Sequence, residues 1–155
     1  MSLNYTNKTI NAFLKPKNIG SIKNPDALAS VGNPVCGDQL SFSIRVKGDR
    51  IKDIKFLSFG CASNIATASV LTQQVKGMTI AEAKKYDWQK IVSILGGLPQ
   101  QKVHCSMMAI EALQRVLAAY EQRLSLASDK KLTITKITKN KLSSKTMASK
   151  QKKVS

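Results

Sequence analysis

The alternating segment 39–47 constrains the fold of this chain more than any other feature of the sequence. Its apolar and polar residues alternate with a period of two, which is typical of a strand with one buried face. The residues predicted to face the core are Leu40, Phe42, Ile44 and Val46. Gly48 and Asp49 supply a two-residue hairpin turn, and 51–59 returns as a second strand. The sequence therefore predicts an antiparallel hairpin.

Helical patterns occupy much of the remaining chain. Small residues gather on one side of 61–74, and apolar residues in 106–124 are spaced three and four apart. The shorter elements that we expect are a helix at 5–15, a strand at 27–31, a helix capped by Thr79 and a helix capped by Asp87. Together these elements predict an α+β fold, in which a small antiparallel sheet of about three strands packs against several helices, the longest of them C-terminal.

The charge of the chain is divided between two regions. The 155 residues include 25 Lys or Arg and 9 Asp or Glu, a net charge of +16, and half of this charge lies in 128–155, where nine lysines face Asp129 alone. This segment has no aromatic residue and no proline, and its aliphatic residues are too few to form a core. We expect one domain over 1–127 and a disordered or weakly structured Lys-rich tail over 128–155.

The distribution of charged and apolar residues also bears on partners and location. The tail offers lysines without arginine or aromatic side chains, so we expect no specific nucleic-acid partner. The sequence has no run of 18 apolar residues and begins without a secretory or transit signal, which predicts no membrane association and a cytoplasmic location. Three cysteines, an odd number, favour free thiols in a reducing compartment over a disulfide framework.

Each cysteine lies where a regular element is expected to begin. Cys36 precedes the first long strand, Cys61 follows the strand break at Gly60, and Cys105 opens the long helix. The N-terminus of a helix favours a thiolate, because its unpaired N–H groups and the helix dipole stabilise negative charge. The thiolate is the form that binds soft metals and attacks sulfur.

Two further ligand types accompany the cysteines: Asp38 follows Cys36 by two residues, and His104, the one histidine, precedes Cys105. Three thiolates with an imidazole or a carboxylate suit zinc, or iron in an iron–sulfur cluster. Taken singly, a free cysteine is more often a small buried hydrophobe, and an Asp after Gly an ordinary turn residue. The coincidence of all five residues at element boundaries favours a metal site assembled from three distant loops.

Three motifs containing these residues occur in a fixed order. They are Asn33-Pro34-Val35-Cys36-Gly37-Asp38, Phe59-Gly60-Cys61-Ala62-Ser63-Asn64-Ile65-Ala66, and Leu98-Pro99-Gln100-Gln101-Lys102-Val103-His104-Cys105-Ser106-Met107. At these motifs the sequence resembles the IscU/NifU N-terminal family of iron–sulfur cluster scaffold proteins. The segment 13–20 also fits the family pattern, and the resemblance covers about residues 5–123.

The resemblance implies a non-catalytic assembly platform. In this family a cysteine desulfurase delivers sulfur as a persulfide, iron(II) is added, and a ferredoxin-type donor supplies electrons. A labile [2Fe-2S] cluster forms and is transferred to apo-proteins. By position, Cys36, Cys61 and Cys105 correspond to the ligand cysteines and Asp38 and His104 to accessory ligands of the iron, with Cys105 as the first sulfur acceptor.

The sequence departs from the family pattern at one motif, and it leaves rival functions open. The stretch that usually reads Leu-Pro-Pro-Val-Lys is Leu98-Pro99-Gln100-Gln101-Lys102, which argues against binding to a dedicated Hsp70 and J-type chaperone pair. A zinc-binding structural or regulatory protein could use the same Cys, Asp and His residues. A cysteine hydrolase built on Cys105 is disfavoured, because His104 is adjacent in sequence and no other histidine could act as a general base.

Overall fold

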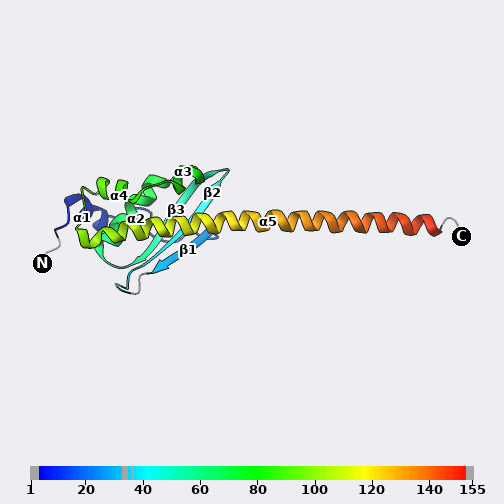
Figure 1. The fold of residues 1–155 in the computed structure, drawn as a ribbon, viewed down its shortest axis with the longest axis horizontal. Coiled ribbons are helices and arrows are strands. Elements are labelled where there is room, and N and C mark those ends of the chain that lie inside the picture. The colour runs from blue at the N-terminus through cyan, green and yellow to red at the C-terminus, as the bar shows by residue number, and fades with distance from the viewer. Residues whose placement is uncertain (1–3, 33–34, 36, 153–155) are drawn as a thin grey trace. The chain divides into compact units, whose positions relative to one another are not determined.

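The structure is a computed structural model that describes residues 4–32, 35 and 37–152, with side chains described as far as residue 131. The elements, shown in Figure 1, are α1 (Asn7–Leu14), β1 (Ala27–Gly32), β2 (Gln39–Lys47), β3 (Arg50–Phe59), α2 (Ala62–Val75), α3 (Ile80–Lys84), α4 (Trp88–Ile94), a 3-10 helix (Gln100–Lys102) and α5 (Val103–Lys152). The α+β class predicted from the sequence is confirmed.

The three strands form one antiparallel sheet in the order β1-β2-β3. Lys47 pairs with Arg50 across the predicted two-residue turn, and Gly48 adopts the positive φ of 65° that a tight hairpin turn requires. Three of the four alternating apolar side chains of β2 are buried: Leu40 is 1% exposed and Phe42 and Ile44 are 0% exposed. Val46, next to a shift in the β2–β3 register, is partly buried against the core. The hairpin predicted from the period of two is therefore confirmed.

Helices cover one face of this sheet (Figure 1). Helix α2 is buried on nearly all sides, and its small residues let it pack between β3, α1 and α4. The first turns of α5 contribute an apolar stripe to the same core. The buried residues of that stripe are Met108, Ala109, Ala112, Leu113, Val116 and Leu117. The two long predicted helices are thus present, and their apolar sides form the core with the sheet.

One end of the sheet gathers the segments that carry the predicted site residues. The register pairs Gln39, the first residue of β2, with Phe59, the last residue of β3. Asp38 therefore enters the sheet where Gly60 and Cys61 leave it. This end of the sheet is where a site built from distant loops can form.

The residues from Glu121 onward form a separate unit. The backbone of α5 is helical as far as Lys152, whereas the composition of 128–155 predicts a disordered or weakly structured tail. The side chains of 121–131 are all exposed. An isolated helix without tertiary packing has marginal stability in water. We propose that the stable domain is complete without the tail at 128–155.

Among the helices of the described residues, none is both long enough and apolar enough to cross a membrane.

Truncation after Ala127 should leave the thermal stability of the domain almost unchanged. The buried side chains of α5 end at Leu117, and removing exposed residues costs at most about 0.5 kcal/mol, or about 2 °C in Tm. Thermal unfolding followed by near-ultraviolet circular dichroism measures this. A fall in Tm of about 10 °C would show that the tail is part of the domain.

Candidate metal centre

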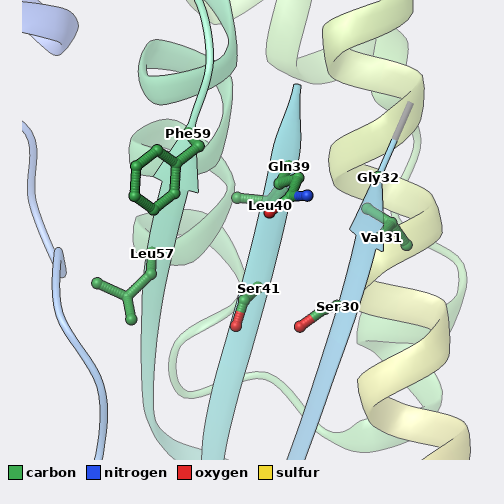
Figure 2. A pocket seen from close by; sticks show the side chains of 8 residues that line it. All are labelled: Ser30, Val31, Gly32, Gln39, Leu40, Ser41, Leu57 and Phe59. Atoms are coloured by element: carbon green, nitrogen blue, oxygen red, sulfur yellow. The ribbon is translucent and has the colours of Figure 1, made fainter. Parts of the chain in front are cut away.

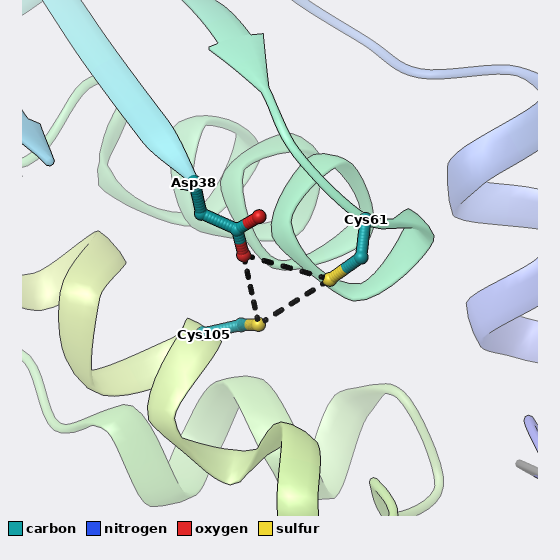
Figure 3. A group of neighbouring side chains, drawn as sticks. All are labelled: Asp38, Cys61 and Cys105. Carbon is teal, nitrogen blue, oxygen red and sulfur yellow. Dashed lines mark hydrogen bonds between the residues drawn. The ribbon is translucent and has the colours of Figure 1, made fainter. Parts of the chain in front are cut away.

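Two cysteines and one aspartate converge at the end of the sheet where β2 begins. Asp38 immediately precedes β2, Cys61 is the N-cap of α2, and Cys105 lies in the first turn of α5. The Cys61 and Cys105 sulfur atoms are 3.6 Å apart, and Oδ2 of Asp38 lies 3.7 Å from the Cys61 sulfur and 4.0 Å from that of Cys105. Figure 3 shows the three side chains pointing toward one another from separate segments.

The spacing of these atoms suits a single tetrahedral metal ion. The three ligand atoms all lie within 4.8 Å of one another. Metal–sulfur bonds of about 2.3 Å at tetrahedral angles place two sulfur ligands about 3.8 Å apart, close to the separation observed. Two soft sulfur ligands and one hard carboxylate oxygen are therefore arranged to hold one thiophilic cation.

His104 lies beside this group. Its Nδ1 is 2.9 Å from the carbonyl oxygen of Gln101, which can only accept, so Nδ1–H is the donor. The other ring nitrogen, Nε2, is 3.8 Å from the Cys105 sulfur. In the neutral ring, this tautomer makes Nε2 the acceptor nitrogen, and it faces the Cys105 sulfur.

Cys36 lies outside the described residues, so its participation stays a prediction. Of its neighbours in sequence, Val35 is 94% exposed and Gly37 has a φ of 75°. The structure therefore brings together Asp38, Cys61 and Cys105, with His104 in contact with Cys105.

The absence of a side chain at Gly60 is what allows Asp38 to approach. A Cβ atom at this position would lie 2.7 Å from Oδ1 of Asp38 and 2.7 Å from Nδ2 of Asn64, which is closer than carbon atoms approach such groups. From the sequence, Gly60 is predicted only to break the strand, and no role is predicted for Asn64. Asn64 is fully buried behind the site, and its Oδ1 has no hydrogen-bond partner among the described residues.

The two thiols share a proton. A hydrogen bond from the Cys105 thiol stabilises the Cys61 thiolate and lowers the pKa of Cys61 to about 6, with smaller help from the Asn64 N–H and the Lys102 ammonium. The same hydrogen bond, together with burial, raises the pKa of the Cys105 thiol. The negative charge of Cys61 in turn raises the pKa of Lys102. The hydrogen bond therefore favours a single negative charge shared by the pair, and Cys61 is the more exposed of the two residues.

A pocket of about 390 Å³ adjoins this end of the sheet on its outer face. Its lining residues are Ser30, Val31, Gly32, Gln39, Leu40, Ser41, Leu57 and Phe59 (Figure 2). Phe59 is 77% exposed and Leu57 is 49% exposed, and Phe59 is only two residues from Cys61. The outer face of the sheet therefore presents exposed apolar side chains at the end of β3 that leads into Cys61.

The sequence is similar to proteins that are named for iron–sulfur cluster assembly. A family model described as the NifU-like N-terminal domain matches residues 4–127. The chain is 48% identical over 116 residues to an iron–sulfur cluster assembly scaffold protein, IscU 1, of Archaeoglobus fulgidus, a match that covers 75% of this chain and 76% of the relative. It is 40% identical over 122 residues to the scaffold protein IscU of Aquifex aeolicus, covering 77% and 78% respectively.

Solved structures share the fold. One is described as a putative iron–sulfur cluster assembly scaffold protein for the SUF system, from Fervidobacterium islandicum. It has a TM-score of 0.62 and 23% identity, and the match covers 73% of this chain and 96% of that one. At this identity the likeness concerns the fold alone.

An α+β domain that brings two thiols and a carboxylate together at one end of its sheet offers a set of ligands that could hold a metal ion. This chain belongs to the NifU-like N-terminal domain family. The family resemblance inferred from the three motifs is confirmed. The two IscU relatives are named as assembly scaffolds rather than as enzymes, which agrees with a non-catalytic role. Neither name mentions zinc, so the alternative of a zinc protein gains no support.

Substitution of Gly60 by alanine should weaken metal binding at this site. The new methyl group would displace Asp38 or Asn64, and disturbing the surroundings of a ligand typically costs about tenfold to a hundredfold in affinity. Titration with cobalt(II), followed by its thiolate charge-transfer absorption, measures this. Gly32→Ala is the matched control, because its Cβ would meet Gln39 Cγ at an ordinary 3.6 Å. Equal affinities for the two variants would contradict the role given to Gly60.

The rate at which iodoacetamide alkylates Cys61 in metal-free protein should rise with a midpoint near pH 6. Only the thiolate reacts, and a pKa of about 6 leaves about nine-tenths of Cys61 ionised at pH 7. Cys105→Ala removes the hydrogen-bond donor, so the midpoint should move up toward that of an ordinary thiol. Peptide mapping by mass spectrometry separates the three cysteines. An unchanged midpoint in Cys105→Ala would contradict the shared proton.

Proposed function

We propose that this protein is a scaffold on which a labile [2Fe-2S] cluster is assembled for transfer to apo-proteins. The observation that supports this most strongly is the convergence of Asp38, Cys61 and Cys105 from three distant segments, in a chain whose relatives are named as cluster assembly scaffolds. Cys36 is proposed as the third thiolate ligand. His104, whose Nε2 lies 3.8 Å from the Cys105 sulfur, is proposed as an accessory ligand.

The chemistry of assembly defines the partners. Sulfane sulfur from a cysteine desulfurase is at the oxidation level of zero, so each sulfide of the cluster requires two electrons. Oxidation of the two iron(II) ions to iron(III) in a [2Fe-2S]²⁺ cluster provides two of the four electrons, and a ferredoxin-type donor is proposed to supply the other two. The iron(II) and the finished cluster are substrate and product of the scaffold, and apo-proteins are the recipients. A cytoplasmic location remains the prediction made from the sequence.

Cys105 is proposed as the first sulfur acceptor, and the site geometry suggests how it would become reactive. Its sulfur is fully buried and its pKa is raised by the hydrogen bond to Cys61. A thiol that coordinates a metal ion is deprotonated. Iron(II) held by Cys61 and Asp38 would occupy the thiolate that accepts the hydrogen bond from Cys105. The Cys105 thiol would then release its proton to solvent as its sulfur coordinates the iron, so sulfur delivery to Cys105 would follow arrival of the metal.

Asp38 is proposed to keep the cluster labile. A carboxylate oxygen is a hard ligand and a poorer match for a soft cluster than a thiolate. Its position within 4.0 Å of both sulfur atoms allows it to exchange with incoming ligands. Lability is a requirement for a scaffold, which must release what it assembles.

Anaerobic reconstitution with iron(II), cysteine and a cysteine desulfurase tests the proposed function. We expect the visible absorption of a [2Fe-2S] cluster, with loss of that chromophore in Cys61→Ser and in Cys105→Ser. Metal and sulfide analysis quantify the product. Failure to form the chromophore while the protein retains stoichiometric zinc would overturn the scaffold function and favour the zinc-binding alternative.

The cluster of an Asp38→Ala protein should be transferred to an apo-ferredoxin about tenfold more slowly than that of the unchanged protein, since the labile ligand is removed. Transfer is followed by circular dichroism of the acceptor cluster. Asp49→Ala, in the hairpin turn, is the matched control and should transfer at the unchanged rate. Transfer from Asp38→Ala at the rate of the control would contradict the role of the carboxylate.

A further inference from the structure

A second pocket, of about 410 Å³, lies at the other end of the sheet from the cysteines. It is lined by Lys47, Arg50, Ile51, Lys52, Lys76 and Gly77. These residues come from the tip of the β2–β3 hairpin and from the C-terminus of α2. Since β2 is nine residues long, this pocket is separated from the metal centre by about 25 Å of strand.

Main-chain hydrogen bonds hold the two sides of this pocket together. The N–H of Gly77 donates to the carbonyl of Ile51 at 2.8 Å, and the N–H of Ile51 donates to the carbonyl of Met78 at 2.9 Å. Arg50 fastens the same junction, because its Nη1 donates to the carbonyl of Gly77 at 3.0 Å. Ile51 is fully buried beneath it. The lysines are thus displayed on a backbone that is already fixed.

The pocket carries an excess of positive charge. Among the described residues, Lys47 and Lys52 have no side-chain hydrogen bond or ion pair, although both line the same concavity. Lys76 has one acidic neighbour, Asp53, at 3.5 Å, and both side chains of this pair remain partly exposed to water. The hairpin turn adds the acidic residue Asp49. Four cations thus face two carboxylates, an imbalance that attracts an anionic ligand.

The hydrogen-bonding pattern indicates which anion fits. Phosphate sites in proteins rely on free main-chain N–H groups and on bidentate arginine. Here the N–H groups of Ile51 and Gly77 are already used, and Arg50 has one guanidinium nitrogen committed to a carbonyl. What remains is a set of separate lysine point charges with apolar stems, which suits carboxylates that are spaced along a chain.

We infer that this basic pocket, lined by Lys47, Arg50, Lys52 and Lys76, is a docking site for an Asp- and Glu-rich segment of a partner protein. Its position leaves the cysteines uncovered, so a partner held here can remain bound while cluster chemistry proceeds at the other end of the sheet. Tethering of this kind raises the effective concentration of a second, weaker contact at the thiols. The benefit of such a tether for cluster chemistry rests on the proposed function, whereas binding of the acidic segment rests on the pocket.

Nuclear magnetic resonance of the full-length ¹⁵N-labelled protein tests the inference at 150 mM salt. The probe is a synthetic decapeptide that alternates Glu and Ser, compared with the same peptide carrying Gln in place of Glu. We expect the Glu peptide to shift the amide signals of 47–52 and 76–77, and the Gln peptide to leave them unchanged. In Lys47→Glu/Lys52→Glu, we expect the dissociation constant to rise about tenfold.

Lys85→Glu/Lys90→Glu is the matched control, because it changes the net charge equally at exposed lysines outside the pocket. Its dissociation constant should stay within about twofold of the unchanged protein, since exposed charges act weakly at a distance. An equal rise of the peptide dissociation constant in both variants would show that the peptide responds only to net charge, and would overturn the inference. Tighter binding of inorganic phosphate or of a single-stranded oligonucleotide to the same amides would overturn it in favour of a phosphate site.

Discussion

The pairing of β2 with β3 is the constraint on which the rest of the site depends. Its register sets Gln39 opposite Phe59, so Asp38 enters the sheet where the chain leaves toward Cys61. The register itself follows from the alternation of β2, because a slip by one residue would turn Phe42 and Ile44 out of the core. Core packing thus fixes which side chains meet at the candidate metal centre. Its two described thiols, Cys61 and Cys105, are 44 residues apart in the sequence.

The local patterns of the sequence predicted the elements well. The hairpin at 39–59 needed only the period of two and a turn at Gly48, both of which act over a few residues. The cysteines were found because each stands at the boundary of an element. The separations of the cysteines in the sequence do not predict that their side chains lie close together. The resemblance of three motifs to a known family indicated one shared site.

Features that arise from contacts between distant segments were not predicted. The role of Gly60 depends on the side chains of Asp38 and Asn64, which come from different elements, so its local sequence indicates only a strand end. The unequal acidity of the two thiols depends on their 3.6 Å separation and on the burial of Cys105. The basic pocket was hidden within a high overall charge, because only the fold shows which lysines share a concavity.

The shared proton has a consequence for how metal uptake responds to acidity. Two independent thiols of ordinary pKa would each release a proton on binding a divalent ion, so affinity would change about a hundredfold for each pH unit near neutrality. Here Cys61 is already ionised above about pH 6, and the only proton left in the pair is the one on Cys105. Affinity at this pair therefore changes only about tenfold per unit, which makes loading of the site less sensitive to fluctuations of pH.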